Sequence, residues 1–126
     1  MIRLALVGSR NHNDYETFSK HVKDWIAKNG KPEVIISGGA HGLDAMARRF
    51  AREEKYSIIE YLPNWKKYKK RAGPIRNKLI VDNATDMIAF PLDGPGTKDS
   101  IEQMRMTKKE PVIIEMSLLQ NKRKID

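Results

Sequence analysis

Short apolar runs separated by segments of helical periodicity constrain the fold of this 126-residue chain more than any other feature. The first run covers residues 2–7, is rich in branched side chains and is typical of a strand buried on both faces. Similar runs follow at residues 34–36, 58–62, 87–90 and 111–115. Strands that alternate with helices imply right-handed crossovers and a parallel sheet covered on both faces. We therefore predict an α/β fold, a single Rossmann-like three-layer α/β/α sandwich whose five-stranded sheet has the order 3-2-1-4-5.

The helices between these runs are indicated by capping residues and apolar spacing. Asn13 and Glu16 form a capping-box pattern for the first helix, and Gly30 ends it. Pro74 suits the first turn of the third helix, and Thr97 can cap the fourth. We expect residues 1–115 to form one domain, followed by a basic C-terminal tail at residues 116–126 that frays at its end.

Composition argues against several classes of protein. Apolar residues make up 40% of the chain, and no apolar run approaches the roughly 18 residues of a membrane span. There is no cysteine, and the first glycine comes too early for a signal-peptide core. The three histidines lack the spacing of metal ligands. We expect a cytoplasmic protein with no membrane partner, no metal and no cofactor.

Positive charge is concentrated in one segment. Lysine and arginine number 24 against 16 acidic residues, which gives a net charge of +8. Residues 66–76 contain six basic residues and no acidic one. Trp65 and Tyr68 lie among these cations as candidate stacking platforms, and Lys70 is a candidate ligand contact. The alternative is a solvated loop that serves solubility alone.

Three unusual loops follow predicted strands, at the sheet edge where ligands bind in folds of this type. Each combines glycine, which lets the backbone approach a ligand, with groups that bind anions. The candidate ligand-binding residues are Gly8, Ser9 and Arg10; Ser37, Gly38, Gly39, Gly42 and Asp44; and Asp93, Gly94, Gly96 and Thr97. The second and third loops precede helices and predict phosphate cradles. The alternatives are a tight crossover for helix packing and, for Asp44, a partner of the helix dipole.

Two further groups could add chemistry to these loops. Asp99 and Glu102 share one face of the helix after the third loop and could act as acid or nucleophile in glycosidic chemistry. Acids in a first helical turn also serve as dipole partners, so this role has a structural alternative. Gly73 precedes Arg76 and Asn77, which could clamp a phosphate and read a sugar or base, or could belong to a capped surface helix.

Four motifs, taken in order, resemble the SLOG superfamily. They are Val7-Gly8-Ser9-Arg10, Ser37-Gly38-Gly39-Ala40-x-Gly42-x-Asp44, Gly73-Pro74-x-Arg76-Asn77 and Asp93-Gly94-x-Gly96-Thr97. That group joins the DNA-processing protein DprA and the LOG cytokinin-activating enzymes, and this chain is most similar to its small YspA/YpsA-related branch. The resemblance covers about residues 1–115. It implies a Rossmannoid domain that binds a nucleotide or nucleotide-derived ligand between these loops.

The resemblance also suggests a reaction and an assembly. LOG enzymes hydrolyse the N-glycosidic bond of adenosine-type monophosphates with an arginine and a glutamate, and by motif Arg76 and Asp99 fall near those positions. Lys98-Asp99-Ser100 departs from the two consecutive glutamates of LOG proteins. LOG-like proteins associate through helices near the pocket, so the resemblance implies a homo-oligomer in which Trp25 or Met104 serves as a contact or a core residue.

Two functions follow from these observations, and a third stays open. The first is a glycine-loop pocket for a nucleotide-type small molecule, with or without hydrolysis of the N-glycosidic bond of a nucleoside 5′-monophosphate. The second is DprA-like binding of single-stranded nucleic acid through residues 66–76. The third is an interaction protein whose pocket is degenerate.

Overall fold

The structure is a computed structural model that describes residues 1–119. Five parallel strands form one sheet in the order β3-β2-β1-β4-β5, which confirms the predicted fold class and strand order. The strands are β1 (Arg3–Gly8), β2 (Val34–Ser37), β3 (Ile58–Glu60), β4 (Asp86–Phe90) and β5 (Val112–Ile113). β1 is central and pairs with both β2 and β4. The strand order reverses between β1 and β4, and such a switch point leaves a crevice at the carboxyl ends of the strands.

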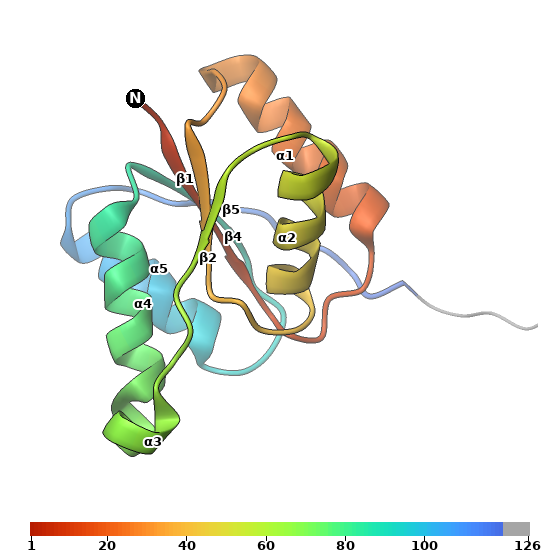
Figure 1. Cartoon of the computed structure of the whole chain (residues 1–126). Coiled ribbons are helices and arrows are strands. Elements are labelled where there is room, and N and C mark those ends of the chain that lie inside the picture. Colours follow the sequence, from red (N-terminus) through yellow and green to blue (C-terminus); the bar gives the residue numbers. More distant parts are fainter. Residues whose placement is uncertain (120–126) are drawn as a thin grey trace, which may run out of the picture.

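Helices cover both faces of this sheet and complete three layers (Figure 1). On one face lie α1 (Tyr15–Asn29) and α2 (Leu43–Glu53), and on the other lie α4 (Ala72–Asn83) and α5 (Gly96–Met106). A short helix, α3 (Trp65–Tyr68), and a 3-10 turn, η1 (Lys69–Arg71), lead directly into α4. In Figure 1, α3 lies at the far end of α4, beyond the sheet.

The two faces of the sheet have separate cores because alternate residues of a strand point in opposite directions. Leu6 belongs to the cluster that contains Phe18 of α1. Its neighbour Val7 belongs to the cluster that contains Ile80 of α4 and Met104 of α5. Burying a large apolar side chain of this kind stabilises the fold by about 1.5–3 kcal/mol. Met104 is fully buried, so it is a core residue rather than a contact for another chain.

Two helix starts differ from the sequence prediction. Asp14, not Asn13, caps α1, and its carboxylate accepts hydrogen bonds from the Thr17 N–H at 3.1 Å and the Thr17 hydroxyl at 2.7 Å. Asn13 instead bonds the main chain of Leu119 through both its amide oxygen and its amide nitrogen. Thr97 does not cap α5, because the helix begins one residue earlier and Thr97 is buried in its first turn.

The basic stretch is helical over residues 65–71 rather than a loop, and it is exposed, so its alternative role in solubility alone stays open. α3 begins after Asn64, whose side-chain oxygen accepts a hydrogen bond from the Lys67 N–H at 3.0 Å. Pro74 lies in the first turn of α4, as predicted, although helical structure begins well before it. No residue of α3 or η1 is buried, so this segment presents its side chains to solvent.

The C-terminal part of the described chain is attached to the body of the molecule. Met116, the first residue of the predicted tail, is buried against the core on the α1 and α2 face. Three residues later, hydrogen bonds to Asn13 attach the main chain of Leu119 to the residue just before the α1 cap. Residues 120–126, the remainder of the predicted tail, lie outside the described residues. No helix in the described part of the chain is long and apolar enough to cross a membrane.

Candidate functional site

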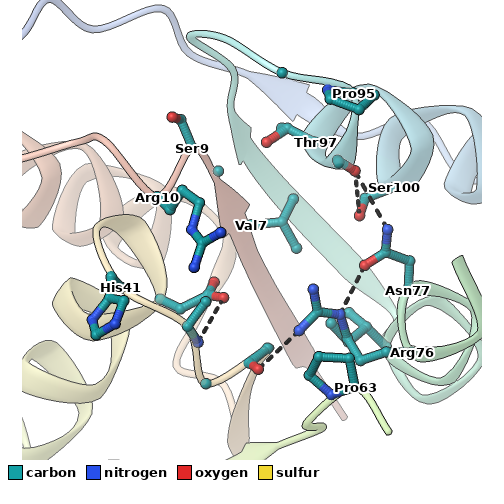
Figure 2. Close-up of a pocket in the computed structure, with 18 of the residues that line it drawn as sticks. Val7, Ser9, Arg10, His41, Pro63, Arg76, Asn77, Pro95, Thr97 and Ser100 are labelled. Carbon is teal, nitrogen blue, oxygen red and sulfur yellow. Dashed lines mark hydrogen bonds between the residues drawn. The ribbon is translucent and has the colours of Figure 1, made fainter. Parts of the chain in front are cut away.

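A cavity of about 700 Å³ opens at the carboxyl ends of β1 and β4, where the strand order reverses. Small-molecule sites in proteins typically have volumes of about 300–1,000 Å³. Loops after β1, β2 and β4 all reach the cavity, and α4 contributes Arg76, Asn77 and Ile80 to its wall. The three loops that are unusual in sequence therefore meet around one space (Figure 2).

The loop between β2 and α2 packs so closely that two of its positions require glycine. A Cβ on Gly38 would collide with the Arg76 guanidinium and would lie 2.9 Å from Oδ2 of Asp44. Gly42 has a φ of +65°, a conformation that L side chains rarely adopt, and a Cβ there would overlap the carbonyl group of Arg10. These close approaches place the loop directly against the end of β1 and against α4.

Asp44 is a buried carboxylate in the cavity wall. It lies in the first turn of α2, is 8% exposed, and its Oδ2 accepts a hydrogen bond from the Ala40 N–H at 3.1 Å. Burial raises the pKa of Asp44 above its ordinary value, and the hydrogen bond from the Ala40 N–H and the charge of Arg76 act in the opposite direction. Burial also lowers the pKa of the Arg76 guanidinium. One side of the cavity therefore holds a carboxylate and a guanidinium that are both desolvated.

Arg76 is largely engaged with protein groups. Its Nη1 donates to the carbonyl oxygen of Gly38 at 2.9 Å and to that of Tyr61 at 3.4 Å. Its Nε donates to Oδ1 of Asn77 at 3.0 Å, as Figure 2 shows. The side chain thus ties α4 to the ends of β2 and β3, in addition to lining the cavity.

The hydrogen bonds continue from Asn77 to α5. Asn77 is 5% exposed, and its Nδ2 donates to Oδ2 of Asp99 at 3.0 Å. The same oxygen of Asp99 accepts a hydrogen bond from Nε2 of Gln103 at 2.8 Å. Asp99 is therefore held between α4 and α5, outside the cavity lining. Glu102 is exposed on α5 and also lies outside the lining.

A second network joins the loop after β1 to the loop after β4. The Ser9 hydroxyl donates to Oδ1 of Asp93, and Nδ2 of Asn11 donates to Oδ2 of Asp93 at 2.7 Å. These hydrogen bonds lower the pKa of Asp93 below its usual value, so this exposed carboxyl is held in its ionised form. Ser9, Asn11 and Asp93 all line the cavity, so the network links two loops of its wall.

Hydrogen-bond donors face the interior of the cavity from two directions. The side chain of Arg10 points into the space from the end of β1 (Figure 2). α5 begins at the cavity wall, where Gly96 and Thr97 are lining residues. The N–H groups of a first helical turn have no partner within the helix and carry a partial positive charge. The arrangement suits an anionic group at this wall.

Trp65 forms part of the mouth of the cavity. It is the first residue of α3, lines the cavity, and is 57% exposed. Lys66, Lys67 and Lys70 are exposed on the same short helical segment. An exposed aromatic face beside a cluster of cations is suited to stacking on a flat, anionic molecule.

Most of the predicted ligand-binding residues meet at this cavity. Those that line it are Gly8, Ser9, Arg10, Gly38, Gly39, Asp44, Trp65, Arg76, Asn77, Asp93, Gly94, Gly96 and Thr97. The predicted residues outside the lining are Ser37, Gly42, Lys70, Gly73, Asp99 and Glu102. Sequence reasoning did not single out Asn11, Ala40, Pro63 or Ser100, which also line it. Asn11, Ala40 and Pro63 follow strand ends directly or closely, and that position is the signal that could have identified them.

Comparison with known proteins gives relatives in sequence and in fold. The model of the family described as the YspA, cpYpsA-related SLOG family matches residues 2–68. The gene 61 protein of Mycobacterium phage D29 is 33% identical over 98 residues, which cover 73% of this chain and 78% of that protein.

Two solved structures are similar in fold. One concerns the single-stranded DNA binding mode of DNA processing protein A from Helicobacter pylori, with 19% identity and a TM-score of 0.70 over 93% of this chain. The other is DNA processing protein A from Streptococcus pneumoniae, with 20% identity and a TM-score of 0.71 over 94% of this chain. This chain covers 66% and 52% of their lengths. The family match and the phage relative, together with the fold, show that this chain belongs to the YspA, cpYpsA-related SLOG family.

Proposed function

We propose that the cavity at the switch point between β1 and β4 binds a nucleotide or nucleotide-derived ligand. The observation that carries the proposal is the convergence of the Gly38–Gly39 and Gly94–Gly96 loops on one space of about 700 Å³. Membership of the SLOG family and the similarity in fold to DNA processing protein A support a ligand of the nucleotide or nucleic-acid class.

Different residues of the cavity lining are suited to different parts of such a ligand. A phosphate accepts hydrogen bonds from the N–H groups at the start of α5, beside Gly96 and Thr97. Arg10 supplies a guanidinium that can pair with the same phosphate, because it points into the space and is exposed. A base stacks on Trp65 at the mouth.

Binding without hydrolysis is the form of the proposal that we favour, because Asp99, the carboxylate to which the resemblance assigns the chemistry, lies outside the cavity lining. An N-glycosidase needs a carboxylate at the scissile bond to stabilise the developing positive charge or to protonate the base. The carboxylates that line the cavity are Asp44 and Asp93, whereas Asp99 is held by Asn77 and Gln103 between two helices. Chromatography for released base, with Asp99→Asn as the comparison, tests the hydrolase form: turnover that Asp99→Asn abolishes while affinity is kept would support it.

A thermal-shift panel of nucleoside mono- and diphosphates, cyclic nucleotides, NAD and ADP-ribose tests the binding proposal. A ligand at about 100-fold over its Kd stabilises the native state by roughly 2.7 kcal/mol, which is a shift of roughly 10 °C for a domain of this size. We expect Arg10→Ala to reduce this shift. Arg52→Ala is the control, because Arg52 is exposed in the last turn of α2 and lies outside the cavity lining. No stabilisation by any member of the panel would contradict the proposal.

Single-stranded nucleic acid on the basic helical segment is the second candidate. The observation that favours it is the exposure of Lys66, Lys67 and Lys70 beside the exposed face of Trp65. The similarity in fold to a protein studied for its binding of single-stranded DNA adds support. Affinity for a short single strand should then fall steeply with salt, because each neutralised phosphate releases a counterion.

A pair of triple variants distinguishes this candidate from the first. Changing Lys66, Lys67 and Lys70 to glutamine should remove most of the salt dependence if the segment binds phosphates. Changing Lys20, Lys28 and Lys31 to glutamine removes the same charge from exposed positions at α1 and the turn after it, and should leave the salt dependence intact. Equal effects of the two triple variants would show that net charge alone is responsible.

A further inference from the structure

Most polar groups that line the cavity are hydrogen-bond donors. Asp44 differs from them because its carboxylate is an acceptor. The N–H groups at the start of α5, the Arg10 guanidinium and the Arg76 guanidinium are all donors. Two carboxylates line the space, and both oxygens of Asp93 accept hydrogen bonds from Ser9 and Asn11. Asp44 is the buried one of the two, at 8% exposure. A ligand built only of hydrogen-bond acceptors would leave Asp44 without a complement.

Asp44 is not explained by an ion pair. Within residues 1–119 no lysine or arginine nitrogen lies within 4.0 Å of its carboxylate. The Arg76 guanidinium lies near Asp44, on the same side of Gly38, and its charge lowers the pKa of Asp44, but its Nη1 and Nε donate to the carbonyl groups of Gly38 and Tyr61 and to Asn77 rather than to the carboxylate. The Ala40 N–H bonds Oδ2, which fixes the orientation of the carboxylate. A buried carboxylate with no cation in direct contact is expensive to maintain for structure alone, and such groups cluster at functional sites.

We propose that Asp44 accepts a hydrogen bond from a ribose hydroxyl of the bound ligand, so that the cavity takes ribonucleotides in preference to deoxyribonucleotides. The inference rests on the proposed function, because it names the sugar of the same ligand. An ionised carboxylate has only acceptor positions, and the cis hydroxyls of a ribose are the donors that a nucleotide carries between its phosphate and its base. Like-charge repulsion keeps the phosphate away from Asp44 and leaves it to the start of α5.

The position of Asp44 agrees with a ligand whose phosphate lies at the start of α5 and whose ribose lies at Asp44. The carboxylate lies at the β2 side of the switch point, on the first turn of α2, whereas the start of α5 follows β4 on the other side of β1. A ligand that reaches the donors after β4 with its phosphate must therefore place a different part of itself against Asp44. Gly38 and Gly39 line the cavity beside Asp44, and their lack of side chains lets Arg76 and Leu62 pack against the loop there.

Matched pairs of ligands test the inference without a variant protein. Dissociation constants are measured by calorimetry at neutral pH for AMP, GMP, CMP and UMP and for the 2′-deoxy counterpart of each, and 3′-deoxy-AMP is added to separate the two hydroxyls. We expect at least one ribonucleotide to bind about tenfold or more tightly than an analogue that lacks a hydroxyl, as is typical of a hydrogen bond to a charged group. Equal affinity for each ribonucleotide and its deoxy analogues would overturn the inference and leave the proposed function intact.

The variant Asp44→Asn then assigns the preference to this side chain. Asparagine keeps an oxygen for the Ala40 N–H and removes the charge. We expect the ribonucleotide to lose about tenfold in affinity while the deoxy analogue changes little, so the two Kd values converge. An equal loss for both ligands would mean that Asp44 acts only by shaping the loop, and would overturn the assignment. Failure of all the nucleotides to bind the unaltered protein would contradict the proposed function itself, and the inference with it.

Discussion

Gly42 shows how strictly a single residue can be determined by the path of the chain. Its φ of +65° and its contact with the Arg10 carbonyl group leave no room for a side chain. We predict that Gly42→Ala destabilises the protein by about 1–3 kcal/mol from the backbone conformation alone, which is one that essentially only glycine adopts, with a further loss from displacement of the Arg10 backbone. Urea unfolding followed by circular dichroism measures the change.

Gly96→Ala is the matched control for that substitution. Nothing lies within 4 Å of a Cβ built on Gly96, and the residue is the first of α5. Alanine there should be neutral or should stabilise the protein by up to about 1 kcal/mol, because glycine is the poorer helix former. A destabilisation by Gly96→Ala as large as that by Gly42→Ala would contradict the role we assign to the geometry at Gly42.

Asp44 gives a prediction about stability and pH. Its pKa is raised by burial above the ordinary value of 3.8, so the native state binds the proton more tightly than the unfolded state does. The ionised group therefore reduces stability at pH values above its raised pKa, and this penalty disappears as the pH falls toward 3.8. Asp44→Asn should raise the unfolding midpoint at neutral pH, and its advantage should shrink in acid. An advantage that is constant with pH, or a loss at neutral pH, would count against burial as the dominant cause.

At the residue scale, the sequence predicted members of the cavity lining where backbone geometry demands a residue type. Gly38, Gly39 and Gly94 belong to the cavity wall, and their glycine-rich context was a sufficient signal. Asp99 differs because its orientation depends on Asn77 and Gln103, which lie on α4 and on the next turn of α5. The amino-acid sequence around Asp99 gives no sign of a hydrogen-bond partner on another helix, so the orientation of its side chain could not be predicted.

At the scale of elements, the strands could be predicted from their apolar runs, but the helix ends could not. Asn13 and Asp14 are both good capping residues, and the choice between them follows from the contact of Asn13 with Leu119. The helical structure of residues 65–71 was also missed, since a dense run of like charges disfavours an isolated helix. Capping by Asn64 and the continuous path into α4 explain why it forms here.

The short helix α3 supports a prediction about ligand affinity. Trp65 is exposed and lines the cavity, and stacking of a base on an aromatic ring contributes about 1–3 kcal/mol. Trp65→Ala should therefore weaken the binding of a nucleotide by roughly five- to 150-fold in Kd, measured by calorimetry. Leu79→Ala is the control, because Leu79 is a half-exposed apolar residue of α4 outside the cavity lining. Equal effects of the two substitutions would remove Trp65 from the site.

At the scale of the whole molecule, the strand order determines both the fold and the position of the cavity. Parallel strands place their carboxyl ends at one edge, and the reversal between β1 and β4 opens that edge between the two helical layers. The alternation of apolar runs and helices was enough to predict this architecture. The volume of the cavity could not be predicted from the sequence. It depends on hydrogen bonds that Arg76, Asn77 and Asp93 make to segments distant in sequence.

The most direct test of a nucleotide site in this cavity is a map of backbone amide chemical shifts during a titration with the nucleotide that gives the largest thermal shift. We predict that the largest changes occur at residues 38–41 and at Gly94, Gly96 and Thr97, because these residues line the cavity and carry backbone N–H groups. Changes confined to residues 65–71, or no changes at saturating nucleotide, would contradict a nucleotide site between the loops after β1, β2 and β4.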